Sequence, residues 1–157
     1  MITILAIGKM KDKALQSLQA EYCKRISPFQ KLEILEVRDE ANDHTDREGE
    51  VRLAMEKEGE RALAKIRPGD FVILLDLHGS EWTSEAFASQ MKTWHESSRN
   101  MVFVIAGSLG PSRALVERAN VRWKLSSLTF THLMTRVILL EQIYRAYMIL
   151  GGRPYHK

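Results

Sequence analysis

The 157-residue sequence has a single cysteine, Cys23, and little that points to a membrane or to secretion. One cysteine cannot form an internal disulfide framework or a cysteine-ligated zinc site, and we therefore expect a cytoplasmic protein. No uncharged apolar run approaches the roughly 18 residues that a membrane span needs. The apolar residues 2–8 follow no basic region and precede no small-residue cleavage site, so they predict a first strand rather than a signal peptide.

The common metal and dinucleotide spacings are also missing. No two of the five histidines are one helical turn apart, as zinc ligands on a helix are, so we expect no metal site. The G-x-G-x-x-G fingerprint follows none of the expected strands, which leaves a Rossmann-type NAD or flavin site without support. Cys23 lies beside the apolar stripe of its helix with no nearby histidine, and we interpret it as a core or boundary residue rather than a nucleophile.

Positive charge is concentrated at the end of the chain. Residues 1–110 have 15 Lys and Arg against 18 Asp and Glu, a balance of −3, whereas residues 111–157 have 8 against 2, a balance of +6. A basic region of this kind attracts the phosphates of a polyanion such as a nucleic acid. The alternative is a basic end that only aids solubility.

Hydrophobic residues make up 45% of the chain and charged residues 27%, which is typical of one globular domain, here residues 1–157. Strand and helix patterns alternate, so we predict an α/β fold with a parallel sheet and helices on both faces. Thr45 begins the second helix, with Glu48 completing a capping box, and Pro68 ends it. The predicted strands are 2–8, 32–37, 71–75, 101–106 and 121–126, and the predicted helices are 12–26, 45–67, 83–98, 112–119 and 131–150.

The last predicted helix, residues 131–150, is apolar on nearly every side. Such a helix requires burial all round, which an outer helix of a small domain does not obtain from its own sheet alone. We expect it to pack on the sheet and also against its copy in a two-fold dimer. Burial within one monomer is the alternative.

Two loops at the ends of predicted strands are candidates for ligand binding. Gly107-x-x-Gly110 follows one strand, and residues 125–130 leave another at the same end of the sheet, where α/β proteins bind ligands. The glycine spacing alone also fits a simple turn, but together the loops form a plausible clamp for a flat polar ring such as adenine. Asp76 ends a third strand; we favour a role in capping the loop around Gly79 over a ribose-binding or catalytic role.

Polar residues on the last helix need a reason. His132 and Arg136 share one face, while Glu141 and Arg145 form a favourable ion pair on nearly the opposite face. The residues belong either to a buried structural network or to an active site at a dimer seam. The tail 151–157 combines aromatic, histidine and basic groups, as proteins that hold unstacked RNA bases do, although a short tail is also often disordered. Because Tyr155–Lys157 lie beyond the last helix, we expect few core contacts to depend on them.

Six segments of the sequence are distinctive: ITILAIGKMK near the N-terminus, EKEGERALAKI, FVIAGSLG (103–110), LTFTHLMTR (128–136), EQIYRAY (141–147) and GRPYHK (152–157). They resemble the RlmH family of bacterial ribosomal RNA large-subunit methyltransferases, which belongs to the SPOUT superfamily. The resemblance covers essentially the whole chain. It implies an α/β SPOUT fold with a C-terminal trefoil knot, a homodimer, and methyl transfer from S-adenosylmethionine to N3 of a pseudouridine in 23S ribosomal RNA of the assembled ribosome.

The same resemblance implies the roles of particular residues. Arg145, Tyr155 and His156 would be catalytic, with the tail reaching across from the partner subunit. His156, or a water that it positions, would serve as a base, or Arg145 would stabilise the imide anion by charge. The substrate side would also include His132, Arg136, Arg153 and Lys157. The cofactor would be bound by Leu75, Ala106, Gly107, Gly110, Leu125, Ser126, Ser127, Leu128, Thr129 and Phe130.

Three positions depart from the family's usual residues: Ala106 replaces glycine, Thr131 replaces proline and Leu133 replaces glutamine. Ala106 adds a methyl group near the cofactor, Thr131 loosens a turn that proline would fix, and Leu133 removes a hydrogen-bonding group. A competing hypothesis is therefore a non-catalytic ribosome-binding or assembly factor of the same fold, which would not bind S-adenosylmethionine. A second alternative is a SPOUT methyltransferase acting on transfer RNA, which the short chain without an added RNA-binding domain disfavours.

Overall fold

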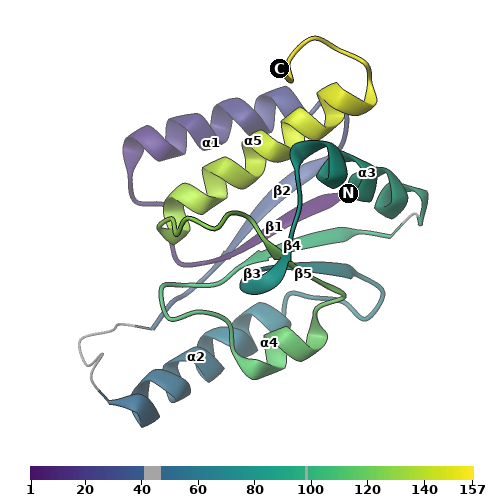
Figure 1. The fold of residues 1–157 in the computed structure, drawn as a ribbon. Coiled ribbons are helices and arrows are strands. Elements are labelled where there is room, and N and C mark those ends of the chain that lie inside the picture. Colours follow the sequence, from purple (N-terminus) through teal and green to yellow (C-terminus); the bar gives the residue numbers. More distant parts are fainter. Residues whose placement is uncertain (41–46, 98) are drawn as a thin grey trace.

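The computed structural model describes residues 1–40, 47–97 and 99–157, and these form one wholly parallel sheet covered by helices on both faces. The strand order is β2-β1-β4-β3-β5, with α1, α3 and α5 on one face and α2 and α4 on the other (Figure 1). The predicted α/β architecture is thus confirmed. In chain order the elements are β1 (Ile2–Ile7), α1 (Lys13–Ile26), β2 (Leu32–Val37), α2 (Glu48–Leu63), β3 (Phe71–Glu81), α3 (Ser84–Glu96), β4 (Met101–Ile105), α4 (Arg113–Arg118), β5 (Val121–Lys124) and α5 (His132–Leu150).

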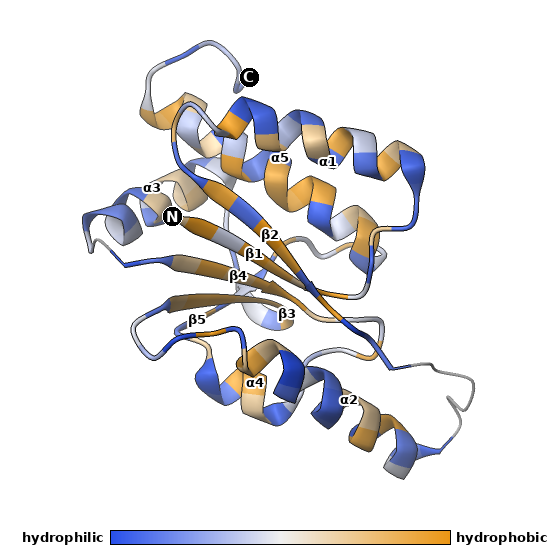
Figure 2. Cartoon of the chain, turned by 180° about the vertical axis from the view of Figure 1, so that it is seen from behind, coloured by the Kyte–Doolittle hydropathy of each residue, from blue (hydrophilic) through white to orange (hydrophobic). Residues whose placement is uncertain are grey.

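Side chains that alternate along the central strands build two separate cores. In β1, Ile2 and Ile4 face the helices α1, α3 and α5, whereas Leu5 and Ile7 face α2 and α4. Strands buried on both faces need continuous apolar sequence, and this explains why β1 and β4 contain almost no polar residues. Figure 2 shows the consequence: apolar colour along the inner strands and on the inward sides of the helices, with hydrophilic residues outside.

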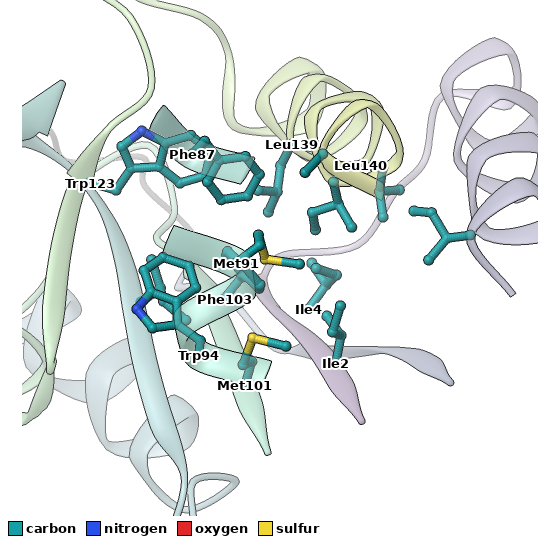
Figure 3. Packing of buried hydrophobic residues seen from close by; sticks show 14 of the residues in the cluster. Ile2, Ile4, Phe87, Met91, Trp94, Met101, Phe103, Trp123, Leu139 and Leu140 are labelled. Atoms are coloured by element: carbon teal, nitrogen blue, oxygen red, sulfur yellow. The ribbon is translucent and has the colours of Figure 1, made fainter. Parts of the chain in front are cut away.

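The larger core contains a group of stacked aromatic rings close to the carboxyl end of the sheet (Figure 3). Phe87 from α3 stacks on Trp123 from β5 with ring centroids 4.3 Å apart, and Trp82 stacks on the same indole at 5.5 Å. Leu139 and Leu140 of α5 contribute to the same core. These contacts fix α3, β5 and α5 relative to one another, and so fix the loop between β5 and α5 at both of its ends.

Short polar side chains cap the N-termini of four of the helices. Each accepts a hydrogen bond from the backbone N–H three residues further on; these residues are Asp12, Thr83, Ser112 and Thr131. Thr131 therefore does not loosen the start of α5, as its replacement of proline suggested. Its hydroxyl, 3.3 Å from the N–H of Met134, provides the cap that proline lacks.

Other boundaries differ from the sequence prediction. The helix α2 ends at Leu63, before Pro68, and short hydrogen-bonded turns between residues 62 and 70 connect it to β3. Its residue before the first turn, Arg47, makes no capping side-chain bond, and the predicted cap Thr45 lies outside the described residues. The strand β3 continues beyond residue 75 to Glu81, through an irregularity in its pairing with β5.

The helix α5 lies between α1 and α3 on one face of the sheet (Figure 1). Eight of its 19 residues are buried, while Met134 and Leu150 remain exposed. Packing of this helix against a second copy of the chain stays a prediction. Across residues 1–40, 47–97 and 99–157, no helix is long and apolar enough to cross a membrane.

Candidate active site

A cavity of about 490 Å³ opens at the carboxyl ends of β3, β4 and β5. It lies between the loop that follows β4, residues 106–111, and the loop that follows β5, residues 125–130. Met55 of α2 and His132 of α5 close its sides. Its volume is in the range of small-molecule sites, and its position is where parallel α/β sheets bind ligands.

The structure brings nearly all the predicted cofactor residues to this cavity. The exception is Ser127, which is exposed and whose hydroxyl donates to the carboxylate of Glu81 at 3.2 Å. The predicted residues that line the cavity are Leu75, Ala106, Gly107, Gly110, Leu125, Ser126, Leu128, Thr129 and Phe130. The role of all the predicted residues in binding a cofactor stays a prediction.

Both loops are braced by their own hydrogen bonds. The N–H of Gly110 donates to the carbonyl of Gly107 at 3.0 Å, and Gly110 has a φ of +92°, which glycine adopts without strain. The hydroxyl of Ser126 accepts from the N–H of Leu128 at 3.0 Å. Loops held in this way present backbone groups to a ligand in a fixed arrangement, which lowers the entropic cost of binding.

Asp76 stabilises the wall of the cavity at β3. Its carboxylate accepts from the N–H of His78 at 2.9 Å and from the guanidinium of Arg122 at 2.7 Å. The loop expected around Gly79 is instead part of β3, in the irregular stretch between Leu75 and Ser80, and Asp76 stabilises this stretch rather than capping a loop. Gly79 is needed in this stretch, because a Cβ at this position would lie 2.5 Å from the backbone of Arg122. Arg122 escaped the sequence reasoning because only the pairing of β3 with β5 brings it to Asp76.

A buried carboxyl group lies beside the loop that follows β4, and the sequence analysis did not identify it. Glu58 of α2 is only 3% exposed, and its Oε2 accepts from the N–H of Glu40 at 2.9 Å. Its Oε1 has no partner among the described residues and would lie 3.3 Å from a Cβ placed on Gly107. Burial raises the pKa of Glu58. Gly107 therefore lies against an acid that favours its neutral form.

His132 and Arg136 share a helix face, as predicted, but only His132 reaches the cavity. Burial, helped by the charge of Arg136, lowers the pKa of His132, which favours the neutral imidazole. Arg136 is completely buried and donates to Glu36 at 2.5 Å and to the carbonyl of Gly8 at 3.2 Å. In this chain α5 packs over the end of β1 and leaves the guanidinium no accessible surface, as the buried structural network that the sequence left open requires. A role of Arg136 in substrate binding stays a prediction.

The predicted catalytic residues form a cluster at the other end of α5. Arg145 donates through Nε and Nη2 to Oε1 of Glu141, at 3.0 and 2.6 Å, and the hydroxyl of Tyr155 donates to the same oxygen at 3.1 Å. His156 contacts Arg145 through Nδ1 at 3.1 Å and Glu85 through Nε2 at 2.5 Å. The tail thus folds back on its own helix through side-chain contacts that lie outside the two cores.

Within one chain, this cluster is far from the cavity. His132 and Arg145 are 13 residues apart on one helix, and at 1.5 Å per residue this is about 20 Å. The two remaining basic residues of the tail, Arg153 and Lys157, are exposed, with the guanidinium of Arg153 over the ring of Phe29. Nowhere in the described parts of the chain do three His, Cys, Asp or Glu side chains form a group able to hold a metal ion.

A parallel sheet with a cavity between two braced loops at its carboxyl edge defines an α/β protein with the usual location for a small-ligand site. The chain belongs to the SPOUT methyltransferase family: the family model described as "Predicted SPOUT methyltransferase" matches residues 1–156. This confirms the resemblance found in the sequence.

Individual relatives agree with the family. The chain is 46% identical over 159 residues to the ribosomal RNA large subunit methyltransferase H of Carboxydothermus hydrogenoformans, and 44% identical over 157 residues to that of Latilactobacillus sakei. Each comparison covers 99% of both chains. A probable methylase family protein from Haemophilus influenzae Rd KW20 has a similar fold, with a TM-score of 0.55 at 10% identity over 99% of this chain and 70% of that one.

Proposed function

We propose that this protein transfers a methyl group from S-adenosylmethionine to N3 of a pseudouridine in 23S ribosomal RNA, acting on the assembled ribosome in the cytoplasm. The observation that carries the proposal is the cavity between residues 106–111 and 125–130, in a chain 46% identical to a ribosomal RNA large subunit methyltransferase H. We propose further that residues 1–157 form one SPOUT domain whose C-terminal segment is threaded into a trefoil knot, and that two copies form a homodimer.

The residues around the cavity fit this cofactor. Leu75, Leu125 and Phe130 offer apolar surface to an adenine ring, and the two loops offer backbone donors and acceptors to its edge. Ala106 lines the cavity with its small methyl group and leaves the cavity open. When bound, S-adenosylmethionine supplies the electrophilic methyl group.

The dimer follows from the separation within one chain. Arg145 and His156 are too far from the cavity of their own chain to act there, so a copy packed across α5 is required to bring them to the cavity of its partner. Apolar residues support such a contact: Met134 is 41% exposed and Leu150 is 40% exposed on this helix, and Leu128 is 70% exposed beside the cavity. His132, Arg153 and Lys157 remain the proposed contacts to the RNA.

The imide N–H of the substrate base must lose its proton for N3 to act as a nucleophile. His156 is suited to take this proton at Nδ1, directly or through a water, once the base replaces Arg145 as its partner. Arg145 is permanently charged and stabilises the resulting anion. Orientation is the remaining contribution: the tail and the cavity hold the base in line with the methyl group.

Radiolabelled S-adenosylmethionine and purified ribosomes that lack the modification provide the test. We expect the wild-type protein to label 23S ribosomal RNA, and truncation of residues 155–157 to abolish labelling while cofactor affinity, measured by isothermal titration, is unchanged. A Gly107→Trp variant should lose cofactor binding instead. Mixed dimers of the two variants should regain activity, because each supplies what the other lacks. Absence of cofactor binding by the wild type would favour the assembly factor, and labelling of transfer RNA would favour the second alternative.

A further inference from the structure

The imidazole of His156 is held at both nitrogens, one by a predicted catalytic residue and the other by a residue with no assigned role. Nδ1 lies 3.1 Å from Nη1 of Arg145, and Nε2 lies 2.5 Å from Oε1 of Glu85. Glu85 comes from the first turn of α3, far from the tail in sequence. The ring therefore bridges α3 and α5.

The chemistry of the two partners decides where the ring proton lies. A guanidinium has only donors, so Arg145 requires a lone pair on Nδ1 of His156. A neutral imidazole has one N–H, which must then be on Nε2, and the carboxylate of Glu85 is the acceptor that this N–H needs. A proton on Nδ1 would point at the N–H of Arg145 and leave Nε2 and Glu85 as two acceptors facing each other.

We propose that Glu85 is a positioning residue of the active site: it fixes His156 in the Nε2–H tautomer and so keeps the Nδ1 lone pair directed at Arg145. The effect extends to the guanidinium, whose other two nitrogens are held by Glu141. With Glu85 in place, all three nitrogens of Arg145 have fixed partners. The consequence for catalysis rests on the proposed function, whereas the tautomer does not.

The backbone beside Glu85 is tied to α5, while the side chain of Glu85 is 62% exposed. The hydroxyl of Ser84, its neighbour, donates to Oε1 of Gln142 at 2.7 Å, and the amide of Gln142 donates to Oε2 of Glu141 at 2.9 Å. Ser84, which directly precedes Glu85, is thus hydrogen-bonded to Gln142 of α5. Gln142 directly follows Glu141, the residue that holds Arg145. The competing interpretation is that Glu85 only stabilises the N-terminus of α3, where acidic side chains are favourable.

Nitrogen NMR of protein labelled with 15N-histidine separates the two interpretations. The chemical shifts of the two ring nitrogens identify the tautomer, and a His156→Asn variant assigns the signals among the five histidines. Spectra are recorded at mildly alkaline pH, where a free imidazole is neutral. The variants are Glu85→Ala, which removes the acceptor, Glu85→Gln, which retains a carbonyl acceptor, and Glu96→Ala as a matched control from the exposed end of the same helix.

We expect the Nε2–H tautomer in the wild type, in Glu85→Gln and in Glu96→Ala, and a mixture of tautomers in Glu85→Ala. In the methylation assay, Glu85→Ala should lower kcat several-fold without changing cofactor affinity, and Glu85→Gln should restore it. An Nδ1–H or charged ring in the wild type would overturn the proposal, as would an unchanged tautomer in Glu85→Ala. If the wild type methylates nothing, the proposed function fails while the spectra still test the tautomer.

Discussion

Replacement of Arg136 by methionine tests whether this residue supports the fold rather than the substrate. The guanidinium is fully buried and donates to the carboxylate of Glu36 and to the carbonyl of Gly8, which follows β1 with a φ of +104°, and at 3.4 Å to the side-chain carbonyl of Gln19. Methionine fills much of the same volume but removes these hydrogen bonds. The variant therefore takes this donor from the carbonyl of Gly8 and the charged partner from the carboxylate of Glu36, which retains the N–H of Met10.

The expected cost follows from the burial of the pair. Removing one partner of a buried ion pair costs about 3–5 kcal/mol, and the lower end applies because the side chain of Glu36 is 34% exposed. About 3 kcal/mol in a chain of this size lowers the Tm by about 6–12 °C. A double variant, Arg136→Met with Glu36→Gln, should recover part of this loss because no charge is then left unpaired.

The penalty should also depend on pH. Burial raises the pKa of Glu36, but hydrogen bonds from Arg136 and from the N–H of Met10 outweigh it, and the net pKa is lowered from 4.5. A lowered pKa in the folded state stabilises the protein above the ordinary pKa, and this stability is lost as the pH falls through the lowered value. The difference between wild type and Arg136→Met should therefore be full at neutral pH and shrink in acid.

Differential scanning calorimetry across this pH range is the assay, with cofactor titration and ribosome methylation measured on the same preparations. A fall in Tm of less than about 2 °C at neutral pH, combined with loss of methylation, would refute the structural role. Such a result would instead support the role of Arg136 in substrate binding that the resemblance implies.

Four further predictions follow from the geometry. Gly107→Ala should weaken cofactor binding in isothermal titration, because its Cβ would lie 3.3 Å from Glu58 and force the loop to shift. Gly79→Ala should cost about 1–3 kcal/mol in denaturant unfolding, because its Cβ would overlap the backbone of Arg122. Glu58→Gln should raise the Tm increasingly above pH 4.5, since the raised pKa of Glu58 means that ionisation destabilises the fold. Light scattering should show a dimer at micromolar concentration, and Met134→Glu should shift it toward the monomer.

The elements that local sequence determines were the ones that could be predicted. An apolar run such as β1 or β4 admits little besides a buried strand, and the starts of α1 and α5 follow from helical periodicity within a few residues of Asp12 and Thr131. The end of α2 was predicted too late in the chain, because the turns that connect this helix to β3 are not visible in helical periodicity. The extension of β3 to Glu81 escaped for a similar reason: it needs pairing with β5, which comes much later in the chain.

The same distinction between local sequence and long-range packing holds for the candidate site. The loops around Gly107 and Leu125 could be predicted because they follow strands of a parallel sheet, which all end at one edge. Glu58 reads as one more acid on an amphipathic helix, and only the packing of α2 against the loop after β4 makes it a buried neighbour of Gly107. A charge on an apolar helix left Arg136 open to a buried network or to an active site, and the sequence could not decide because its partner Glu36 lies 100 residues earlier in the chain.

Mapping of modified nucleosides by mass spectrometry tests the central claim most directly. Ribosomal RNA is compared from cells that contain this protein, cells that lack it, and cells that carry the variant truncated before Tyr155. The account predicts one additional methyl group on a single pseudouridine of 23S ribosomal RNA, present only with the full-length protein. Identical 23S ribosomal RNA in all three strains, or a methyl group missing from transfer RNA instead, would contradict it.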